Sequence, residues 1–134
     1  MLNILGIDHI VLRTTRTQKM LDFYQQVLGC KLERELPELG LIQLRAGSSL
    51  IDIVPVDSEL GRLGGRPPSQ DGRNLEHFCL TVAGVDEAQL LEFLAAHDID
   101  AGEPAERYGA SGFSRSVYIN DPEGNVVELK LLAI

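Results

Sequence analysis

Two histidines and two carboxylates occupy matching places in the two halves of this 134-residue chain. His9 and His77 each lie in a first predicted strand, and Asp52 and Glu128 each lie in a last one, among apolar neighbours. Histidine and carboxylate side chains are common ligands of divalent transition metals. Two neutral imidazoles and two carboxylates compensate one divalent ion, whereas two buried carboxylates without an ion repel each other. We therefore expect one metal site made from these four residues.

Each of these residues, taken alone, also has an ordinary structural explanation. A strand histidine often binds a backbone group or faces solvent, and a strand carboxylate usually points to water. Their recurrence at the same strand and phase of a repeat is what favours the metal site. Four protein ligands leave two octahedral positions for water or for substrate oxygens. The ligand types do not identify the ion, which we expect to be Ni, Zn, Mn, Co or Fe.

An internal repeat positions the four residues. The segment DHIVLR superposes on EHFCLT, and LDFYQQVLGC superposes on LLEFLAAHDI. The last strands of the two halves then bring Asp52 to the place of Glu128. A unit of this size does not bury its own sheet, so we expect the halves, or halves from two chains, to pack around a shared concavity.

Hydrophobic periodicity and turn residues predict the same order of elements in each half. The first half reads as a strand near 5–14, a helix over 17–28 capped by Thr15 or Thr17, and strands at 30–35, 41–45 and 50–56. The second half reads as a strand at 75–82, a helix capped by Asp86, and strands at 115–120 and 125–132. Residues 57–74 and 102–114 carry glycines and read as loops. The fold class is α+β, one domain of two βαβββ modules at 1–56 and 75–134, joined by 57–74.

Composition narrows the classes of function. The net charge is −8 and the sequence pI is about 4.8, which disfavours nucleic acid and anionic membrane surfaces as partners. No apolar segment approaches the length of about 18 residues that a membrane-spanning helix needs, so we expect a cytoplasmic protein. Cys30 and Cys79 lie far apart without a CxxC spacing, and we expect both to be small buried apolar residues.

Four segments resemble the vicinal oxygen chelate superfamily, which groups glyoxalase I, fosfomycin-modifying thiol transferases, extradiol dioxygenases and bleomycin-binding proteins. They are DHIVLRT, LDFYQQVLGCKL, EHFCLTV and INDPEGNVVELK, so the resemblance covers nearly the whole chain. It implies paired βαβββ modules forming a cupped mixed sheet, in which His9, His77 and Glu128 hold a metal and Asp52 occupies the place of the fourth ligand. Small members are commonly homodimers, so the cup is built either within one chain or between two.

The resemblance implies a metal-dependent lyase or isomerase of the glyoxalase I type. Its small substrate chelates the metal through two adjacent oxygens, and a proton moves between neighbouring carbons through an enediolate. Glu128 is then the base, and Asp52 serves the opposite face. Arg13, four residues after His9, is a candidate anchor for a substrate anion, as in the glyoxalase I segment that receives a glutathione carboxylate.

The substrate itself is open, because the chain departs from glyoxalase I where that enzyme contacts glutathione. No asparagine follows Asp52 at the matching place, and the segment ERYGASGFSR replaces a lysine-bearing loop. In this segment, the candidates for binding an anionic or aromatic compound are Arg107, Tyr108, Phe113 and Arg115. Two alternatives are an extradiol-type dioxygenase and a metal-free drug-binding protein of the bleomycin-resistance type. An aromatic content of 5% and an intact ligand set favour an enzyme over a binding protein.

Overall fold

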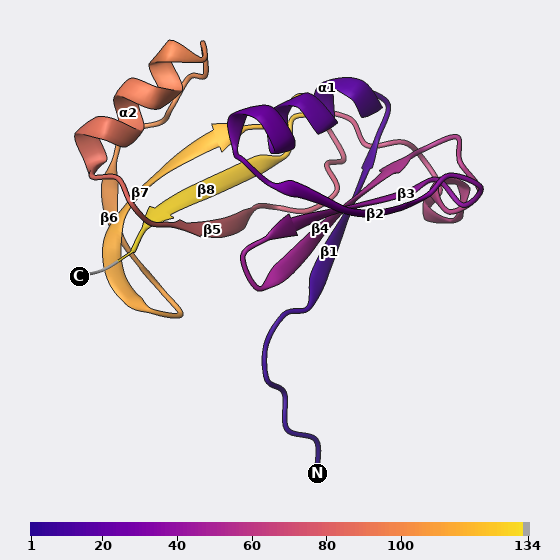
Figure 1. The fold of residues 1–134 in the computed structure, drawn as a ribbon, viewed down its shortest axis with the longest axis horizontal. Coiled ribbons are helices and arrows are strands. Elements are labelled where there is room, and N and C mark those ends of the chain that lie inside the picture. Colours follow the sequence, from indigo (N-terminus) through magenta and orange to yellow (C-terminus); the bar gives the residue numbers. More distant parts are fainter. Residues whose placement is uncertain (133–134) are drawn as a thin grey trace. The chain divides into compact units, whose positions relative to one another are not determined.

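The computed structural model describes residues 1–132 of the chain. It divides into two compact units, Met1–Asn74 and Leu75–Ile134, and each unit holds a four-stranded mixed sheet with a helix (Figure 1). The α+β class with two βαβββ-like modules is therefore confirmed. The segment 57–74 belongs to the first unit, because Asn74 exchanges two hydrogen bonds with the backbone of Arg13 on the first strand. None of the helices in the described part of the chain is long and apolar enough to cross a membrane.

The first unit has the strand order β1-β4-β3-β2, with β1 parallel to β4 and the other pairs antiparallel. Its elements are β1 (His9–Thr14), α1 (Thr17–Leu21), η1 (Asp22–Val27), β2 (Lys31–Leu36), β3 (Leu41–Ala46), β4 (Ser49–Pro55) and the short 3-10 helix η2 (Gly61–Gly64). The π-helical η1 continues α1 without a break, so the helix predicted over 17–28 is confirmed.

One face of the first sheet packs against the helix, and the other face carries the polar residues of interest. Alternation along β1 and β4 places Leu12, Ile51 and Ile53 on the helix side, where they are buried with Met20 and Tyr24. Burial of these large apolar side chains provides the main stabilisation of the unit. The residues between them in sequence, Asp52 among them, point to the opposite face.

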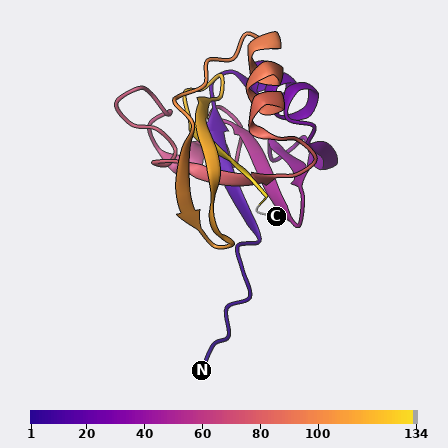
Figure 2. The same ribbon diagram turned by 90° about the vertical axis from the view of Figure 1, so that its left-hand side faces the viewer.

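The second unit repeats this arrangement with the strand order β5-β8-β7-β6, and β5 runs parallel to β8. Its elements are β5 (Phe78–Val82), α2 (Glu87–Ala96), β6 (Ala105–Gly109), β7 (Gly112–Asn120) and β8 (Val126–Leu131). The antiparallel pair β6–β7 is seen most clearly in Figure 2. Val117, Ile119, Val127 and Leu129 are buried on one face of the sheet, and Leu90 and Leu94 are the buried residues of α2.

The two helices begin in different ways. Asp86 caps α2 as predicted, since its side chain accepts from the Gln89 amide and the Gln89 side chain accepts from the Asp86 amide. The prediction of Thr15 or Thr17 as the cap of α1 is wrong. Arg16 is the N-cap residue, and its amide donates to the hydroxyl of Thr14, which turns the chain from β1 into the helix.

The expectation of a loop over 102–114 is also wrong. Residues 105–109 form β6, and β7 begins at Gly112, with a two-residue turn between the strands. Because this hairpin is short and rich in charged and small residues, its strands lack a clear apolar alternation, and the glycines at both ends of the turn read as a loop.

Candidate metal centre

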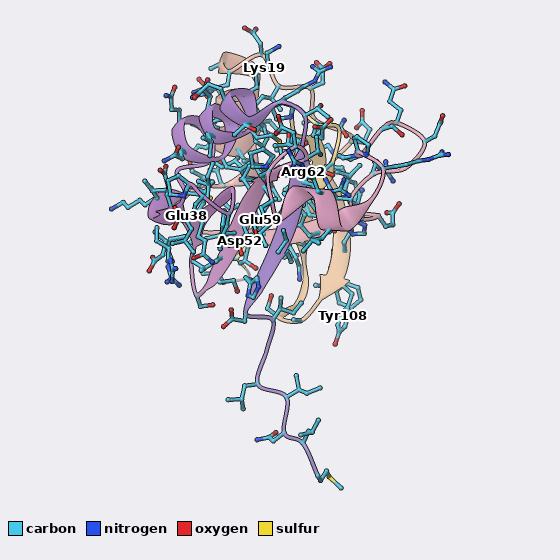
Figure 3. The ribbon with its side chains drawn as sticks, turned by 90° about the vertical axis from the view of Figure 1, so that its right-hand side faces the viewer. Lys19, Glu38, Asp52, Glu59, Arg62 and Tyr108 are labelled. Carbon is cyan, nitrogen blue, oxygen red and sulfur yellow. The ribbon has the colours of Figure 1, made fainter. Side chains whose placement is uncertain are left out.

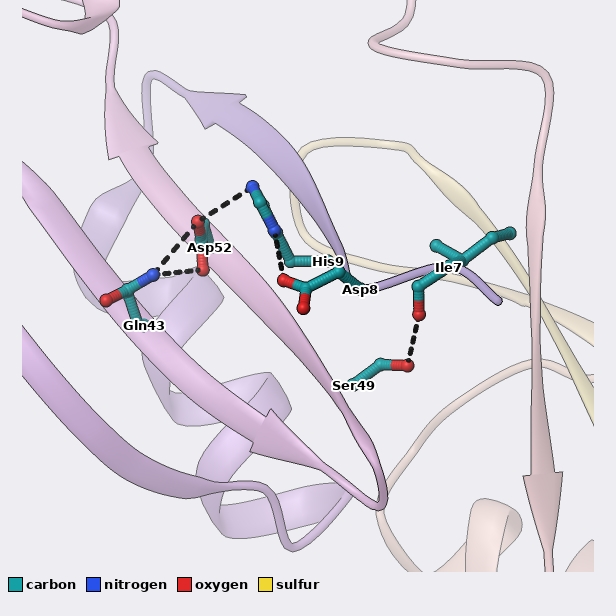
Figure 4. Close-up of polar contacts among 6 residues, drawn as sticks. All are labelled: Ile7, Asp8, His9, Gln43, Ser49 and Asp52. Atoms are coloured by element: carbon teal, nitrogen blue, oxygen red, sulfur yellow. Dashed lines mark hydrogen bonds and ion pairs between the residues drawn. The ribbon is translucent and has the colours of Figure 1, made fainter. Parts of the chain in front are cut away.

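The first unit brings His9 and Asp52 together at the polar face of its sheet. The Nε2 atom of His9 lies 4.0 Å from Oδ2 of Asp52, and the Asp52 residue is only 3% exposed (Figure 4). Gln43 lies directly opposite Asp52 on β3 and donates from Nε2 to both carboxylate oxygens, at 3.2 and 3.3 Å. The amide thus orients the carboxylate toward the histidine.

The other ring nitrogen of His9 is held by the preceding residue. Nδ1 lies 2.7 Å from Oδ1 of Asp8, and this contact favours a proton on Nδ1 while Nε2 faces Asp52 (Figure 4). The pKa of His9 is raised above its usual value, mainly by this hydrogen bond and to a lesser extent by the charge of Asp52. The carboxylate that faces Nε2 thus favours positive charge there, which either a proton or a bound cation can supply.

The second unit repeats the pair with closer spacing. Nε2 of His77 lies 3.5 Å from Oε1 of Glu128, which is 7% exposed, and Nδ1 of His77 lies 2.8 Å from Oε1 of Glu76. Tyr118 lies directly opposite Glu128 on β7, at the place that Gln43 has in the first unit. Its ring meets the imidazole of His77 edge to face, with centroids 5.4 Å apart, and so supports the orientation of that imidazole.

The spacing of each pair can be compared with that of two ligands on one ion. Ligand atoms bound at about 2.1 Å lie about 3.0 Å apart at a right angle and about 3.4 Å apart at a tetrahedral angle. The pair of His77 and Glu128 fits this range almost without movement, and the pair of His9 and Asp52 is about half an ångström wider. Both are too long for a charge-assisted hydrogen bond, which prefers about 2.7–2.9 Å. The donor sets therefore suit a divalent ion, with two ligands in each unit.

The residues that sequence reasoning missed are those that support the ligands. Asp8 and Glu76 precede the two histidines, and the repeat shows an acid before each of them, so this signal was visible in the superposed segments. Gln43 and Tyr118 carry no such signal, because they are unlike each other and are related only through the strand register.

Arg107 is placed on the same face of the second sheet as Glu128. Its guanidinium carbon lies 4.5 Å from the centre of the Tyr118 ring, and Nη1 donates to the carbonyl of Ser116 at 2.7 Å and to its hydroxyl at 3.0 Å. The Tyr118 ring, which contacts His77, thus also forms a cation–π contact with Arg107. Of the predicted substrate-binding residues in the second unit, Arg107 is the one that lies near a predicted ligand.

The structure does not bring Tyr108 or Arg115 to that face. Pairing of β6 with β7 places both on the opposite side of the sheet, where Arg115 forms an ion pair with Glu87 of α2 at 2.6 Å. Tyr108 is 74% exposed, meets Phe113 edge to face and projects outward from β6 (Figure 3). The register, which alternation in so polar a hairpin does not reveal, decides which face each residue occupies.

Arg13 serves the fold of the first unit. Its guanidinium donates to the carbonyls of Gly65 and Arg66, so it ties the end of β1 to the segment after η2. The Nε atom of Arg13 is buried without a hydrogen-bond partner among the described residues. The guanidinium predicted to anchor a substrate anion is therefore occupied largely by backbone carbonyls.

The two cysteines are free, and they differ in their surroundings. Cys30 is buried as predicted, whereas Cys79 is exposed and lies directly opposite Glu128 on β5, so the expectation that both are buried is wrong for Cys79. The pKa of Cys79 is raised to about 11, mainly by desolvation and to a lesser extent by the charge of Glu128. The charge of Lys130 lowers it, but by less. The thiol is thus protonated at neutral pH and is a poor metal ligand.

Comparisons with known proteins agree with this architecture. The family model described as Glyoxalase/Bleomycin resistance protein/Dioxygenase superfamily matches residues 6–129. The chain belongs to this superfamily. It is 28% identical over 128 residues to virulence protein STM3117 of Salmonella typhimurium, covering 92% of this chain and 81% of that protein. It is 30% identical over 132 residues to the glyoxalase domain-containing protein RDO1 of Mycosarcoma maydis, covering 96% of this chain and 69% of that protein.

Two solved structures share the fold over nearly the full chain. The crystal structure of STM3117 matches with a TM-score of 0.77 and 25% identity, over 98% of this chain and 100% of that one. The lactoylglutathione lyase of Agrobacterium tumefaciens matches with a TM-score of 0.63 and 21% identity, over 96% of this chain and 94% of that one. At that identity, the second likeness shows the fold alone.

Proposed function

We propose that this superfamily member is a metal-dependent enzyme that binds one divalent ion through His9, Asp52, His77 and Glu128. The observation that carries the proposal is the pair in each unit, where a histidine Nε2 faces a buried carboxylate beyond hydrogen-bonding distance. We propose that a first-unit pair and a second-unit pair complete one site, either within a chain or between the subunits of a homodimer. The ion is Ni, Zn, Mn, Co or Fe.

The proposed reaction is a glyoxalase I-like proton transfer on a small substrate that has two adjacent oxygens. When bound, the ion supplies Lewis-acid stabilisation of negative charge on those oxygens. Glu128 takes a proton from one carbon and returns it to the neighbouring carbon, because its burial beside His77 excludes water from the carboxylate. Asp52, oriented by Gln43, serves the opposite face of the substrate.

Proton exchange at carbon tests this proposal. Hemithioacetals of methylglyoxal with several thiols, glutathione included, are incubated in D2O with protein loaded with each candidate ion, and proton NMR follows exchange and isomerisation. We expect turnover in the wild type and its loss in Glu128→Gln. Glu92→Gln, an exposed position on α2, is the matched control and keeps wild-type turnover. Equal turnover in Glu128→Gln and the wild type would contradict the role of Glu128.

A further inference from the structure

A buried lysine lies beside the Glu128 half-site and has no part in the proposed reaction. Lys130 follows Glu128 by two residues on β8, so both side chains lie on the same face of the sheet. The Lys130 residue is only 3% exposed. In the described part of the chain, the one hydrogen bond of its ammonium goes to the carbonyl of Gly112, at the turn between β6 and β7. An ammonium has three N–H donors, so two remain for a ligand.

Gly109 provides the space that this ammonium occupies. A Cβ atom built at Gly109 would lie 2.9 Å from Nζ of Lys130, so any side chain there would have to displace the ammonium. The backbone itself does not require a glycine, because Gly109 is not among the residues with positive φ. We therefore attribute the glycine at this position to the room that the Lys130 ammonium needs.

A second cation approaches the same strand segment from β6. Arg107 donates to the carbonyl and the hydroxyl of Ser116, and Ser116 lies directly opposite Lys130 on β7. Arg107 is half-buried, and its guanidinium is held flat against Tyr118 rather than extended into water. Lys130 and Arg107 thus both start from the face that carries Glu128, with the ammonium at the carbonyl of Gly112 and the guanidinium at Ser116.

Neither cation has an acidic partner. Among residues 1–132, neither Lys130 nor Arg107 lies within ion-pair distance of a carboxylate, whereas Arg115 on the other face pairs with Glu87. In the proposed function, the charge of Glu128 compensates the metal ion, so it does not neutralise Lys130 or Arg107. A chain with a net charge of −8 thus keeps two unpaired cations on one face. Because an unpaired buried charge is costly, an anion from outside the chain would stabilise this face.

We propose that Lys130 and Arg107 bind an oxyanion, a carboxylate or a phosphate, that the substrate carries close to its metal-chelating oxygens. The inference rests on the proposed function, because it places this anion on the substrate of the His77–Glu128 pair. Because Lys130, Arg107 and Glu128 start from one face of the sheet, we expect a small acid that carries its oxyanion and its two adjacent oxygens in one short molecule.

The first test needs no metal. Metal-free protein is titrated with inorganic phosphate and, separately, with acetate, while proton–nitrogen NMR follows the Arg107 side-chain Nε–H and the amides of Gly112 and Ser116. We expect saturable shifts in the wild type and at least about tenfold weaker binding in Lys130→Met, since a charge-assisted hydrogen bond is lost. Lys19→Met removes an exposed ammonium from α1 and is the matched control (Figure 3). Shifts of equal size in Lys130→Met and the wild type would overturn the proposal.

The second test uses metal-loaded protein and three hydroxamates that share one chelating head. Acetohydroxamate has no further charge, succinic monohydroxamate carries a carboxylate, and phosphonoacetohydroxamate carries a phosphonate. Calorimetry should show at least one charged probe binding about tenfold more tightly than acetohydroxamate, with this advantage lost in Lys130→Met and in Arg107→Met. Arg107 is only half-buried, so its variant tests the proposal even where the buried Lys130 substitution impairs folding.

The two tests separate the inference from the function on which it rests. If no hydroxamate binds but the phosphate or acetate shifts persist and depend on Lys130, the anion site stands and the metal chemistry is wrong. If acetohydroxamate binds and neither charged probe binds more tightly, the metal chemistry stands and the anion site is overturned.

Discussion

The acidic residues that precede the two histidines should tune metal affinity without binding the ion. Glu76 accepts the Nδ1 proton of His77 at 2.8 Å, and its own side chain is 80% exposed. Replacing Glu76 with Gln keeps a carbonyl acceptor in the same place and removes the charge. Replacing it with Ala removes the acceptor as well. The two substitutions therefore separate the effect of the charge from that of the hydrogen bond.

The size of each effect follows from the geometry. A hydrogen bond to a charged group exceeds a neutral one by about 1 kcal/mol, which corresponds to about fivefold in affinity. Because water screens most of the Glu76 carboxylate, we expect about three- to fivefold weaker binding in Glu76→Gln and about tenfold in Glu76→Ala. Asp8 holds His9 in the same way in the first unit, and the two acids share no partner, so the effects of Asp8→Asn and Glu76→Gln should add.

Competition with a chromophoric chelator measures the Kd of the ion for each variant. Glu92→Gln makes the same chemical change at an exposed position of α2 and serves as the control for net charge. A Kd in Glu76→Ala equal to that of Glu92→Gln would refute the reasoning, since it would mean that the imidazole is oriented without its acidic neighbour.

Three further predictions concern the surroundings of the site. Asn125→Ala removes a buried amide that donates to Asp121 at 2.8 Å, so the free energy of unfolding should fall by about 1–3 kcal/mol, and an unchanged Tm would contradict this. Arg13→Met releases the carbonyls of residues 65–66, so proteolysis near them should accelerate, unlike in Arg16→Met. Burial raises the pKa of Cys30, so the stability this thiol contributes is complete below its unfolded pKa of about 8.5 and is lost as pH rises through the folded pKa. The fall in unfolding free energy above that pH should be smaller in Cys30→Val.

The repeat is the part of this protein that sequence reasoning predicts best. Its signals are local: alternation along each strand, the capping box at Asp86 and the Pro-Gly turn before β8 all act within a few residues. The register then places Asp52 and Glu128 at equivalent points, opposite Gln43 and Tyr118. The structure groups His9 with Asp52 and His77 with Glu128, and one metal site made from all four residues stays a prediction.

The parts that sequence reasoning did not predict depend on contacts between distant residues. Sequence pattern alone does not show that Arg107 faces Tyr118 while Arg115 faces Glu87, because both arginines lie in a polar hairpin whose register is set by pairing. Lys130 was missed for a similar reason. A lysine near the end of the chain reads as a solvated residue, and its burial depends on the sheet around it.

Metal content tests the central claim most directly. Protein purified without chelators or affinity-tag metal is analysed by mass spectrometry, and the wild type is compared with Glu128→Gln, His9→Ala and the control Glu92→Gln. The account predicts about one divalent ion for each completed four-ligand site in the wild type and the control, with sharply less in the other two. A wild type that holds no ion, and takes up none on titration with Ni, Zn, Mn, Co or Fe, would contradict it and favour a metal-free small-molecule binding protein.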